Sequence, residues 1–197
     1  MYHRIGVTAA STPATTRRLT VDPRTFERQM LWLHRNGFRT ITQQELYEGL
    51  ALGKKLPSKP VLITFDAYVI TDRCGDWRSP FLTWFELLEL ERRGIEIGSH
   101  TVSHRDLRAL SDRELRHELV ASRRTLEHRL RHPVRWLAYP FGGHDGRVVA
   151  AARRAGYALA VTTVGGTGQD RAQPLRLRRL SITSTTGAQG LASMLGG

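Results

Sequence analysis

Short apolar segments alternate with amphipathic helical segments along most of the chain, and this alternation constrains its fold more than any other feature. Asp22-Pro23 is typical of a helix start, an N-cap before a proline at the first helical position, and Gly37 ends that helix. Three capping boxes predict further helices: Thr42 with Glu45, Thr83 with Glu86, and Ser111 with Glu114. Strands that alternate with such helices predict parallel βα units.

The apolar segments between the helices are short and mostly lack strict alternation, as expected for strands that are covered on both faces. They are the opening segment around His3, then Phe38–Ile41, Pro60–Asp66, Ala67–Asp72, Ile95–Ser99, Val134–Tyr139, Tyr157–Thr163 and Leu175–Ile182. Seven or eight strands favour a closed or nearly closed barrel, whereas six would suit a doubly wound open sheet equally well. From the strands and helices alone we predict an α/β fold, a closed or nearly closed (β/α) barrel, in a single domain over residues 1–197.

One boundary breaks this pattern. Pro60–Asp66 runs directly into Ala67–Asp72, with no turn residue and no helix between them. Two parallel neighbouring strands need a connection of about a dozen residues or more, usually a helix. Either the two segments form one unusually long strand, or a βα connection is missing after Asp66. We expect the second.

The composition excludes several classes of protein. A chain of 197 residues with 40% hydrophobic and 24% charged residues can bury its own core, which argues against a disordered tail or a small disulfide scaffold. The single cysteine, Cys74, cannot form an internal disulfide, and no apolar run approaches the length of a transmembrane helix. No signal peptide is visible, and because the chain opens inside a strand we expect that an upstream segment is missing.

The net charge of +12 favours acidic partners such as nucleic acid or an anionic surface. All but three of the 30 basic residues are Arg, and they are spread along the whole chain. This pattern fits a biased genome composition better than a nucleic-acid site, and no recognised nucleic-acid motif is present. We therefore expect no specific nucleic-acid binding.

Polar residues that could carry chemistry follow the expected strands, at the carboxyl ends where βα folds place their sites. On a helical turn, His100 and His104 would direct their imidazoles at one metal ion, although such a pair is also compatible with a helix cap and a surface residue. Asp66 ends its strand and fits a metal ligand, a general base or a strand-end cap. The turn Tyr139-Pro140-Phe141 and the histidine His3 also follow strands.

Together these motifs resemble the polysaccharide deacetylases, the NodB-homology family or carbohydrate esterase family four. The similarity is greatest to the branch that de-N-acetylates poly-N-acetylglucosamine. It runs over nearly the whole chain, and its most specific parts are Gly-Ser-His-Thr at 98–101 and Ala-Tyr-Pro-Phe-Gly at 138–142. The resemblance implies a metal-dependent hydrolase that removes N-acetyl groups from a polysaccharide such as poly-N-acetylglucosamine, a chitin-like polymer or the peptidoglycan glycan. It also implies an incomplete or distorted seven-stranded (β/α) barrel of the TIM type that holds one divalent cation, often zinc.

The resemblance further implies a role for each matching residue. These residues are His100 and His104 as metal ligands, Asp66 as general base, His3 as general acid, Tyr139, Pro140 and Phe141 as the turn that lines the substrate groove and offers a backbone donor to the oxyanion, and Arg179 as the residue that orients the catalytic aspartate. The resemblance also implies that the protein is located in the cell envelope or the extracellular space. The lack of disulfides is compatible with either side of a membrane. The oligomeric state is left open.

The sequence departs from the family pattern directly after Asp66. The family's second aspartate, its third metal ligand, should stand at position 67, where this chain has Ala67, and the glycine and helix that normally follow are absent as well. If the connection is only left out of this sequence, the parent protein keeps its ligand; if it is deleted, two histidines and at most Asp66 remain. The alternatives to an enzyme are a catalytically impaired carbohydrate-binding relative and, ranked lower, a basic nucleic-acid-binding protein.

Overall fold

A computed structural model of the chain describes residues 1–66, 70–72, 74 and 82–196. The chain divides into two compact units. The first comprises Met1–Ala67, Gly165–Thr167 and Leu180–Gly197, and the second comprises Tyr68–Val164 and Gly168–Arg179. Both combine helices with short strands that pair in parallel, which confirms the predicted α/β class.

In the first unit, parallel pairing joins segments that are far apart in the sequence. The pairs are β1 (Arg4–Ile5) with β2 (Thr20–Val21), β3 (Arg39–Thr40) with β4 (Pro60–Val61), and an isolated bridge between Tyr2 and Phe65. The chain segment that starts with β4 therefore pairs with β3 at its beginning and with the segment of β1 at its end. This arrangement brings the residues that follow Tyr2 and Phe65 to the same edge.

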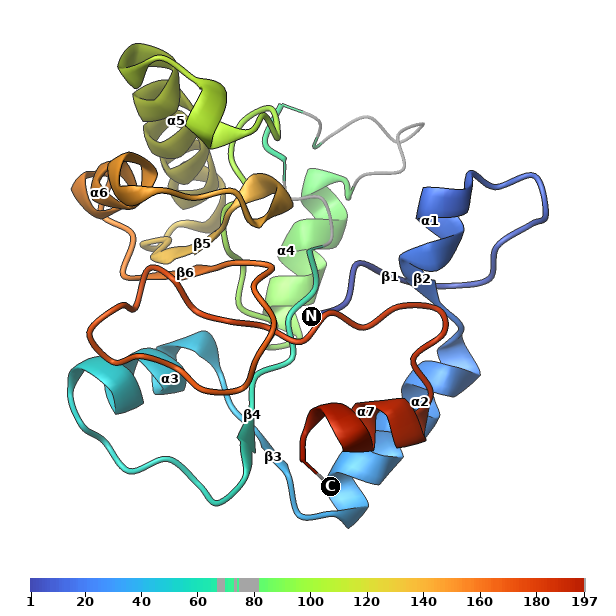
Figure 1. The fold of residues 1–197 in the computed structure, drawn as a ribbon. Helices are drawn as coiled ribbons and strands as arrows, with labels where there is room; N and C mark the ends of the chain where they lie inside the picture. The colour runs from blue at the N-terminus through green and yellow to red at the C-terminus, as the bar shows by residue number, and fades with distance from the viewer. Residues whose placement is uncertain (67–69, 73, 75–81, 197) are drawn as a thin grey trace. The chain divides into compact units, whose positions relative to one another are not determined.

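The helices of the first unit are α1 (Ala14–Arg18), α2 (Pro23–Arg35), α3 (Gln43–Ala51) and α7 (Ala188–Met194). As predicted, the side chain of Asp22 caps α2, accepting the N–H groups of Arg24 and Thr25. Helices α2 and α7 lie side by side (Figure 1). Leu33 of α2 and Leu191 of α7 belong to one buried apolar cluster. The unit thus has its own core.

The second unit contains a row of parallel segments with helical crossovers. Its strands and bridges are β5 (Trp136–Ala138) paired with β6 (Leu159–Val161), Ser99 bridged to Leu137, and Val161 bridged to Leu177. Its helices are α4 (Trp84–Arg92), the 3₁₀ helix η1 (Leu107–Ala109), α5 (Asp112–Leu130), the 3₁₀ turn η2 (Pro140–Gly142) and α6 (Gly146–Arg154). Helix α5 leads from Ser99 to β5 and α6 leads from β5 to β6, so these two parallel steps have the helical connection that is usual for them. The third step, from Val161 to Leu177, is made by residues 162–176 without a helix.

Helix α5 supplies much of the core of this unit. Leu115 and Leu119 pack in one buried cluster with residues of β5, α6 and β6, while Leu126 and Leu130 pack in another with Leu87 of α4. The predicted capping box at Ser111 and Glu114 is present and starts the helix. Local capping and a stripe of leucines therefore fix both the start and the buried face of α5.

The strands are shorter than the apolar segments that predicted them. Of Ile95–Ser99 only Ser99 pairs, and of Leu175–Ile182 only Leu177 pairs, each as an isolated bridge. Thr71 and Asp72, at the end of the predicted strand Ala67–Asp72, lie in a turn, while residues 67–69 lie outside the described part of the chain. Helices α1 and α7 and strand β2 were not predicted. Within the described residues, no helix is long and apolar enough to cross a membrane.

Candidate active site

In the first unit, the structure places His3 and Asp66 in register on neighbouring parallel segments, although His3 lies directly before β1 and not after a strand as predicted. The N–H of Tyr2 donates to Thr64 O at 2.8 Å, and the N–H of Asp66 donates to Tyr2 O at 2.9 Å. His3 and Asp66 are each the next residue after the bridged pair, Tyr2 and Phe65. Residues in register on parallel neighbours project to the same face, so both side chains leave the same face of this edge. Both are partly buried.

In the second unit, His100 and His104 converge on each other. Their Nε2 atoms are 3.1 Å apart, and their ring centroids are 4.6 Å apart. Residues 100–104 form a loop and not the helical turn that the spacing suggests. The loop is bent by positive φ angles, 71° at Thr101 and 62° at His104. The predicted pair therefore comes together, by a different backbone path.

The orientation of His100 suits a metal ligand. His100 is 7% exposed, and its Nδ1 lies 2.8 Å from Ala138 O. A carbonyl accepts only from a protonated nitrogen, so Nδ1 carries the hydrogen and Nε2 presents its lone pair toward His104. Metal-bound histidines are commonly fixed in this way by a carbonyl behind the ring.

The separation of the two nitrogens fits a divalent cation such as zinc. Two imidazoles on one tetrahedral zinc, with bonds of about 2.0–2.1 Å, would have their nitrogens roughly 3.3 Å apart, close to the observed 3.1 Å. Within the described residues, no group of three or more His, Cys, Asp or Glu side chains gathers in a way that could hold a metal. The second unit thus provides a two-histidine half-site.

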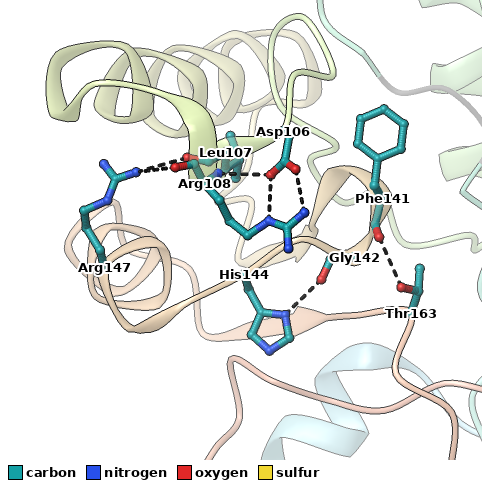
Figure 2. Close-up of polar contacts among 8 residues, drawn as sticks. All are labelled: Asp106, Leu107, Arg108, Phe141, Gly142, His144, Arg147 and Thr163. Atoms are coloured by element: carbon teal, nitrogen blue, oxygen red, sulfur yellow. Dashed lines mark hydrogen bonds and ion pairs between the residues drawn. The ribbon is translucent and has the colours of Figure 1, made fainter.

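The turn Tyr139-Pro140-Phe141 lies directly beside this half-site. Phe141 is 66% exposed, and its ring meets the ring of His104 edge-on, with 4.6 Å between centroids. Its backbone has φ = 56°, and Thr163 Oγ1 donates to its carbonyl at 3.1 Å. The ring and the carbonyl of Phe141 point in opposite directions (Figure 2). The turn therefore presents an aromatic ring next to the histidines while its carbonyl is tied down.

The side chain of Tyr139 has a different environment. It is 1% exposed, and its hydroxyl donates to Leu175 O at 3.0 Å. Burial raises the pKa of Tyr139 above its usual range, so the hydroxyl stays protonated at neutral pH. Its ring stacks against His144, with 5.5 Å between centroids. Tyr139 thus anchors the turn, and Phe141 is the aromatic ring that it exposes.

The backbone donors of this turn are nearly all occupied. The N–H of Tyr139 donates to Val161 O, that of Gly142 to Tyr139 O, and that of Gly143 to Pro140 O. Proline has no N–H. Among the described residues no acceptor pairs with the N–H of Phe141, which makes it the donor that the turn can offer to a bound molecule.

A polar cluster supports the turn from η1 and α6 (Figure 2). Arg108 binds the carboxylate of Asp106 through two nitrogens, at 3.0 and 2.6 Å, and this pairing lowers the pKa of Asp106. Arg147 of α6 donates to the carbonyl of Arg108 at 3.1 Å. A Cβ at Gly143 would lie 2.9 Å from Asp106 Oδ1, so the chain after Phe141 packs closely on this ion pair. Neither arginine was singled out from the sequence.

Arg179 belongs to the second unit and is 7% exposed, with its Nε donating to Thr162 O at 2.8 Å.

Sequence reasoning also missed a buried carboxylate, Glu118 of α5, which binds the backbone of the loop that carries His100 and His104. A signal for it exists, because Glu118 falls on the apolar stripe of α5 between Leu115 and Leu119, where a charged residue is unexpected.

Comparison with known sequences gives a consistent result. Residues 67–160 match the sequence model of the family described as polysaccharide deacetylase. The Bacillus subtilis (strain 168) protein YxkH, whose name places it among the polysaccharide deacetylases, is 29% identical over an alignment of 203 positions that takes in 93% of this chain and 70% of that protein. The alignment is longer than the chain, so YxkH contains residues that have no counterpart here.

Solved structures share the fold. A Streptococcus pyogenes deacetylase, PplD, in complex with acetate superposes with a TM-score of 0.90 at 24% identity, covering 98% of this chain and 95% of that one. A polysaccharide deacetylase from Bacillus cereus has a TM-score of 0.82 at 26% identity, covering 98% of this chain and 67% of that one.

Proposed function

Because the chain belongs to the polysaccharide deacetylase family, we propose that it hydrolyses the N-acetyl groups of a polysaccharide built from N-acetylglucosamine, at a site that holds one divalent cation. The observation that carries the proposal is the convergence of His100 and His104, 3.1 Å apart at Nε2, beside the exposed ring of Phe141. The two residues that match metal ligands thus face each other next to a residue that matches the substrate groove.

His100 and His104 would hold the cation, and zinc fits their nitrogen donors. A bound cation supplies Lewis-acid polarisation of the acetamide carbonyl and lowers the pKa of water. His100 contributes a ring whose tautomer is fixed by Ala138 O. The ring of His104 also contacts the ring of Phe141 edge-on.

Asp66 and His3 would supply the proton transfers of amide hydrolysis. Asp66 accepts the proton of the attacking water as general base, and His3 donates a proton to the departing sugar amine as general acid. Their positions in register on neighbouring parallel segments support paired roles. The resemblance gives Arg179 the role of orienting the catalytic aspartate, and this role stays a prediction.

The N–H of Phe141 would stabilise the oxyanion that forms on the acetamide carbonyl. The N–H groups of Tyr139, Gly142 and Gly143 already donate to backbone carbonyls of the turn and of the neighbouring strand β6. A well-placed backbone donor of this kind contributes roughly 3–4 kcal/mol to the transition state. The exposed ring of Phe141 would meanwhile contact the apolar face of a sugar.

The substrate class implies where such an enzyme acts. N-acetylated polysaccharides of this kind belong to the cell envelope or the extracellular matrix, so we propose that the enzyme acts there.

The direct test of the activity is acetate release from N-acetylglucosamine oligomers by the full chain, with zinc present. Asp66→Asn should abolish acetate release and leave zinc partly bound, because it removes a base and keeps the shape of the side chain. Near-normal acetate release would remove Asp66 as the base.

The histidine half-site is tested separately by metal analysis. His100→Ala and His104→Ala should each abolish zinc retention after dialysis, because each removes half of the described donor set. His144→Ala is the matched control, since His144 lies in the same region but stacks on Tyr139 and binds Gly142 O through Nδ1. Zinc content that is unchanged by both of the first two substitutions would refute the site.

One observation favours a second candidate, a carbohydrate-binding relative without turnover. Ala67 stands where the family places its third metal ligand. Such a protein would bind N-acetylglucosamine oligomers and release no acetate from them at any zinc concentration. Binding without acetate release would therefore support this candidate against the enzyme.

A further inference from the structure

A buried carboxylate from α5 binds the loop that carries the two histidines. Glu118 is 4% exposed. Its Oε2 accepts the N–H of Val102 at 2.9 Å and the N–H of Ser103 at 3.0 Å, and its Oε1 accepts the hydroxyl of Ser103. These three hydrogen bonds all go to residues between His100 and His104.

The loop needs such restraint because its backbone is strained. Thr101 and His104 both have positive φ, which costs a non-glycine residue conformational energy. Conformations of this kind persist only where the surroundings over-determine them. The N–H groups of two consecutive residues, Val102 and Ser103, point at one carboxylate oxygen, which fixes the middle of the loop between the two strained positions.

The same face of α5 also holds the start of the loop. Ser122 lies one turn after Glu118, on the same side of the helix, and accepts a hydrogen bond from the Ser99 hydroxyl at 2.9 Å. The N–H of Thr101 donates to Ser99 Oγ at 3.2 Å, and the N–H of His104 donates to Thr101 Oγ1 at 3.1 Å. A chain of hydrogen bonds thus runs from α5 to His104.

We propose that Glu118 is a positioning residue for the metal: it holds the 100–104 loop so that the Nε2 atoms of His100 and His104 point at one cation. The inference rests on the metal site proposed above. A buried charge is costly unless it is fully hydrogen-bonded, and Glu118 occupies a position on the apolar stripe of α5 where a leucine would pack. Its partners on the loop offset that cost, and the loop in return gains its shape.

The test compares zinc affinity in the wild-type chain, Glu118→Ala and Glu118→Gln, by competition with a chromophoric chelator. Loss of a group that hydrogen-bonds a metal ligand typically weakens metal binding about 10–100-fold. Glu118 acts through the backbone between the two histidines, so for Glu118→Ala we expect a loss at the lower end of this range, about tenfold. Glu118→Gln should lose less, because its carboxamide oxygen still accepts from Val102 and Ser103 while its NH₂ group donates to the Ser103 hydroxyl. If the zinc affinity of Glu118→Ala stays within about twofold of the wild-type value, the proposal is overturned.

Leu126→Ala is the control for general loosening of α5. Leu126 is fully buried on the same helix but packs in the cluster with Leu87 and Leu130, away from the loop contacts. It should lower the melting temperature at least as much as Glu118→Ala does and leave zinc affinity unchanged. If Leu126→Ala weakens zinc binding as strongly as Glu118→Ala, the role of Glu118 is only structural and the proposal fails.

Amide hydrogen exchange without metal separates this inference from the proposed function. The N–H groups of Val102 and Ser103 should exchange about tenfold faster in Glu118→Ala than in wild type, because each loses a charged acceptor. Leu126→Ala should show no such selective change. Unchanged exchange at both amides would overturn the role of Glu118 even if zinc binds. Wild-type protein that retains no zinc would instead overturn the metal site, and with it the role of Glu118 toward a cation.

Discussion

At the scale of single residues, the turn after Tyr139 depends on a glycine whose backbone conformation and close packing disfavour any side chain. Gly142 has φ = 72°, a left-handed value that favours glycine. A Cβ at this position would contact Thr163 Oγ1 and lie 2.5 Å from the backbone N of Thr163. Because the second atom belongs to the backbone, truncating Thr163 would not relieve the clash. The same Thr163 binds the carbonyl of Phe141, so the close approach and the placement of the exposed ring are linked.

Gly142→Ala should therefore destabilise the protein by about 3 kcal/mol, combining left-handed strain with overpacking, and should reduce acetate release by displacing Phe141. Urea denaturation gives the free energy of unfolding. Gly146→Ala is the control, because Gly146 is the first residue of α6, has an ordinary φ, and nothing would lie within 4 Å of its new Cβ. It should be neutral or stabilising by about 0.4–1 kcal/mol. Equal losses in the two variants would contradict this reading of the turn.

At the scale of elements, a histidine–carboxylate pair ties the ends of α4 and α5 together. His132, just after α5, binds Glu91 of α4 through Nε2 and the carbonyl of Pro133 through Nδ1. The hydrogen bond to Glu91, followed by the one to Pro133, raises the pKa of His132 above 6.5. A raised pKa in the folded state stabilises it fully below about pH 6.5, and this stabilisation is lost as the pH rises through the folded-state value.

His132→Gln should accordingly destabilise the protein more at pH 5.5 than at pH 8.5. The difference should stay below about 1 kcal/mol, because the pair is partly exposed to solvent. Denaturant titrations of both proteins at the two pH values measure it. In a Glu91→Gln background the pH dependence of the His132 effect should shrink, because only the smaller contributions such as the Pro133 carbonyl remain. An undiminished pH dependence there would show that Glu91 is not the main cause.

Helix starts could be predicted from the sequence because capping is local. The caps at Asp22, Thr42, Thr83 and Ser111 all bind the first turn of their own helix, within three residues. The limits of the strands could not be predicted in this way, because a strand such as β2 has only two residues and is defined by its pairing with β1. Helices α1 and α7 have no side-chain cap, so the chain carries no local signal for them.

The candidate site follows the same division. The spacing of His100 and His104 predicted that the two side chains converge. The prediction that they lie on a helical turn was wrong, because the loop is held by hydrogen bonds to Glu118, fourteen positions after His104. The roles of Asp66, His3 and Arg179 stay predictions. The break after Asp66 was visible as a missing connection, and residues 67–69 lie outside the described part of the chain.

At the scale of the whole molecule, a chain that unfolds as one domain and a chain of two independently unfolding units would respond differently to zinc. His100 and His104 both belong to the second unit. If residues 1–197 unfold as one domain, as the sequence predicts, zinc at 100 times its Kd raises the free energy of unfolding of the entire chain by about 2.7 kcal/mol. For a chain of this size that corresponds to a Tm about 5–10 °C higher.

Scanning calorimetry with and without zinc measures this shift. We expect one transition that moves upward as a whole in the wild-type chain and does not move in His100→Ala, because that variant lacks half of the described donor set. Two transitions, of which zinc moves only one, would contradict the single-domain prediction and leave the metal site standing. A single transition that zinc does not move would contradict the metal site, since a ligand that binds the folded state must stabilise it.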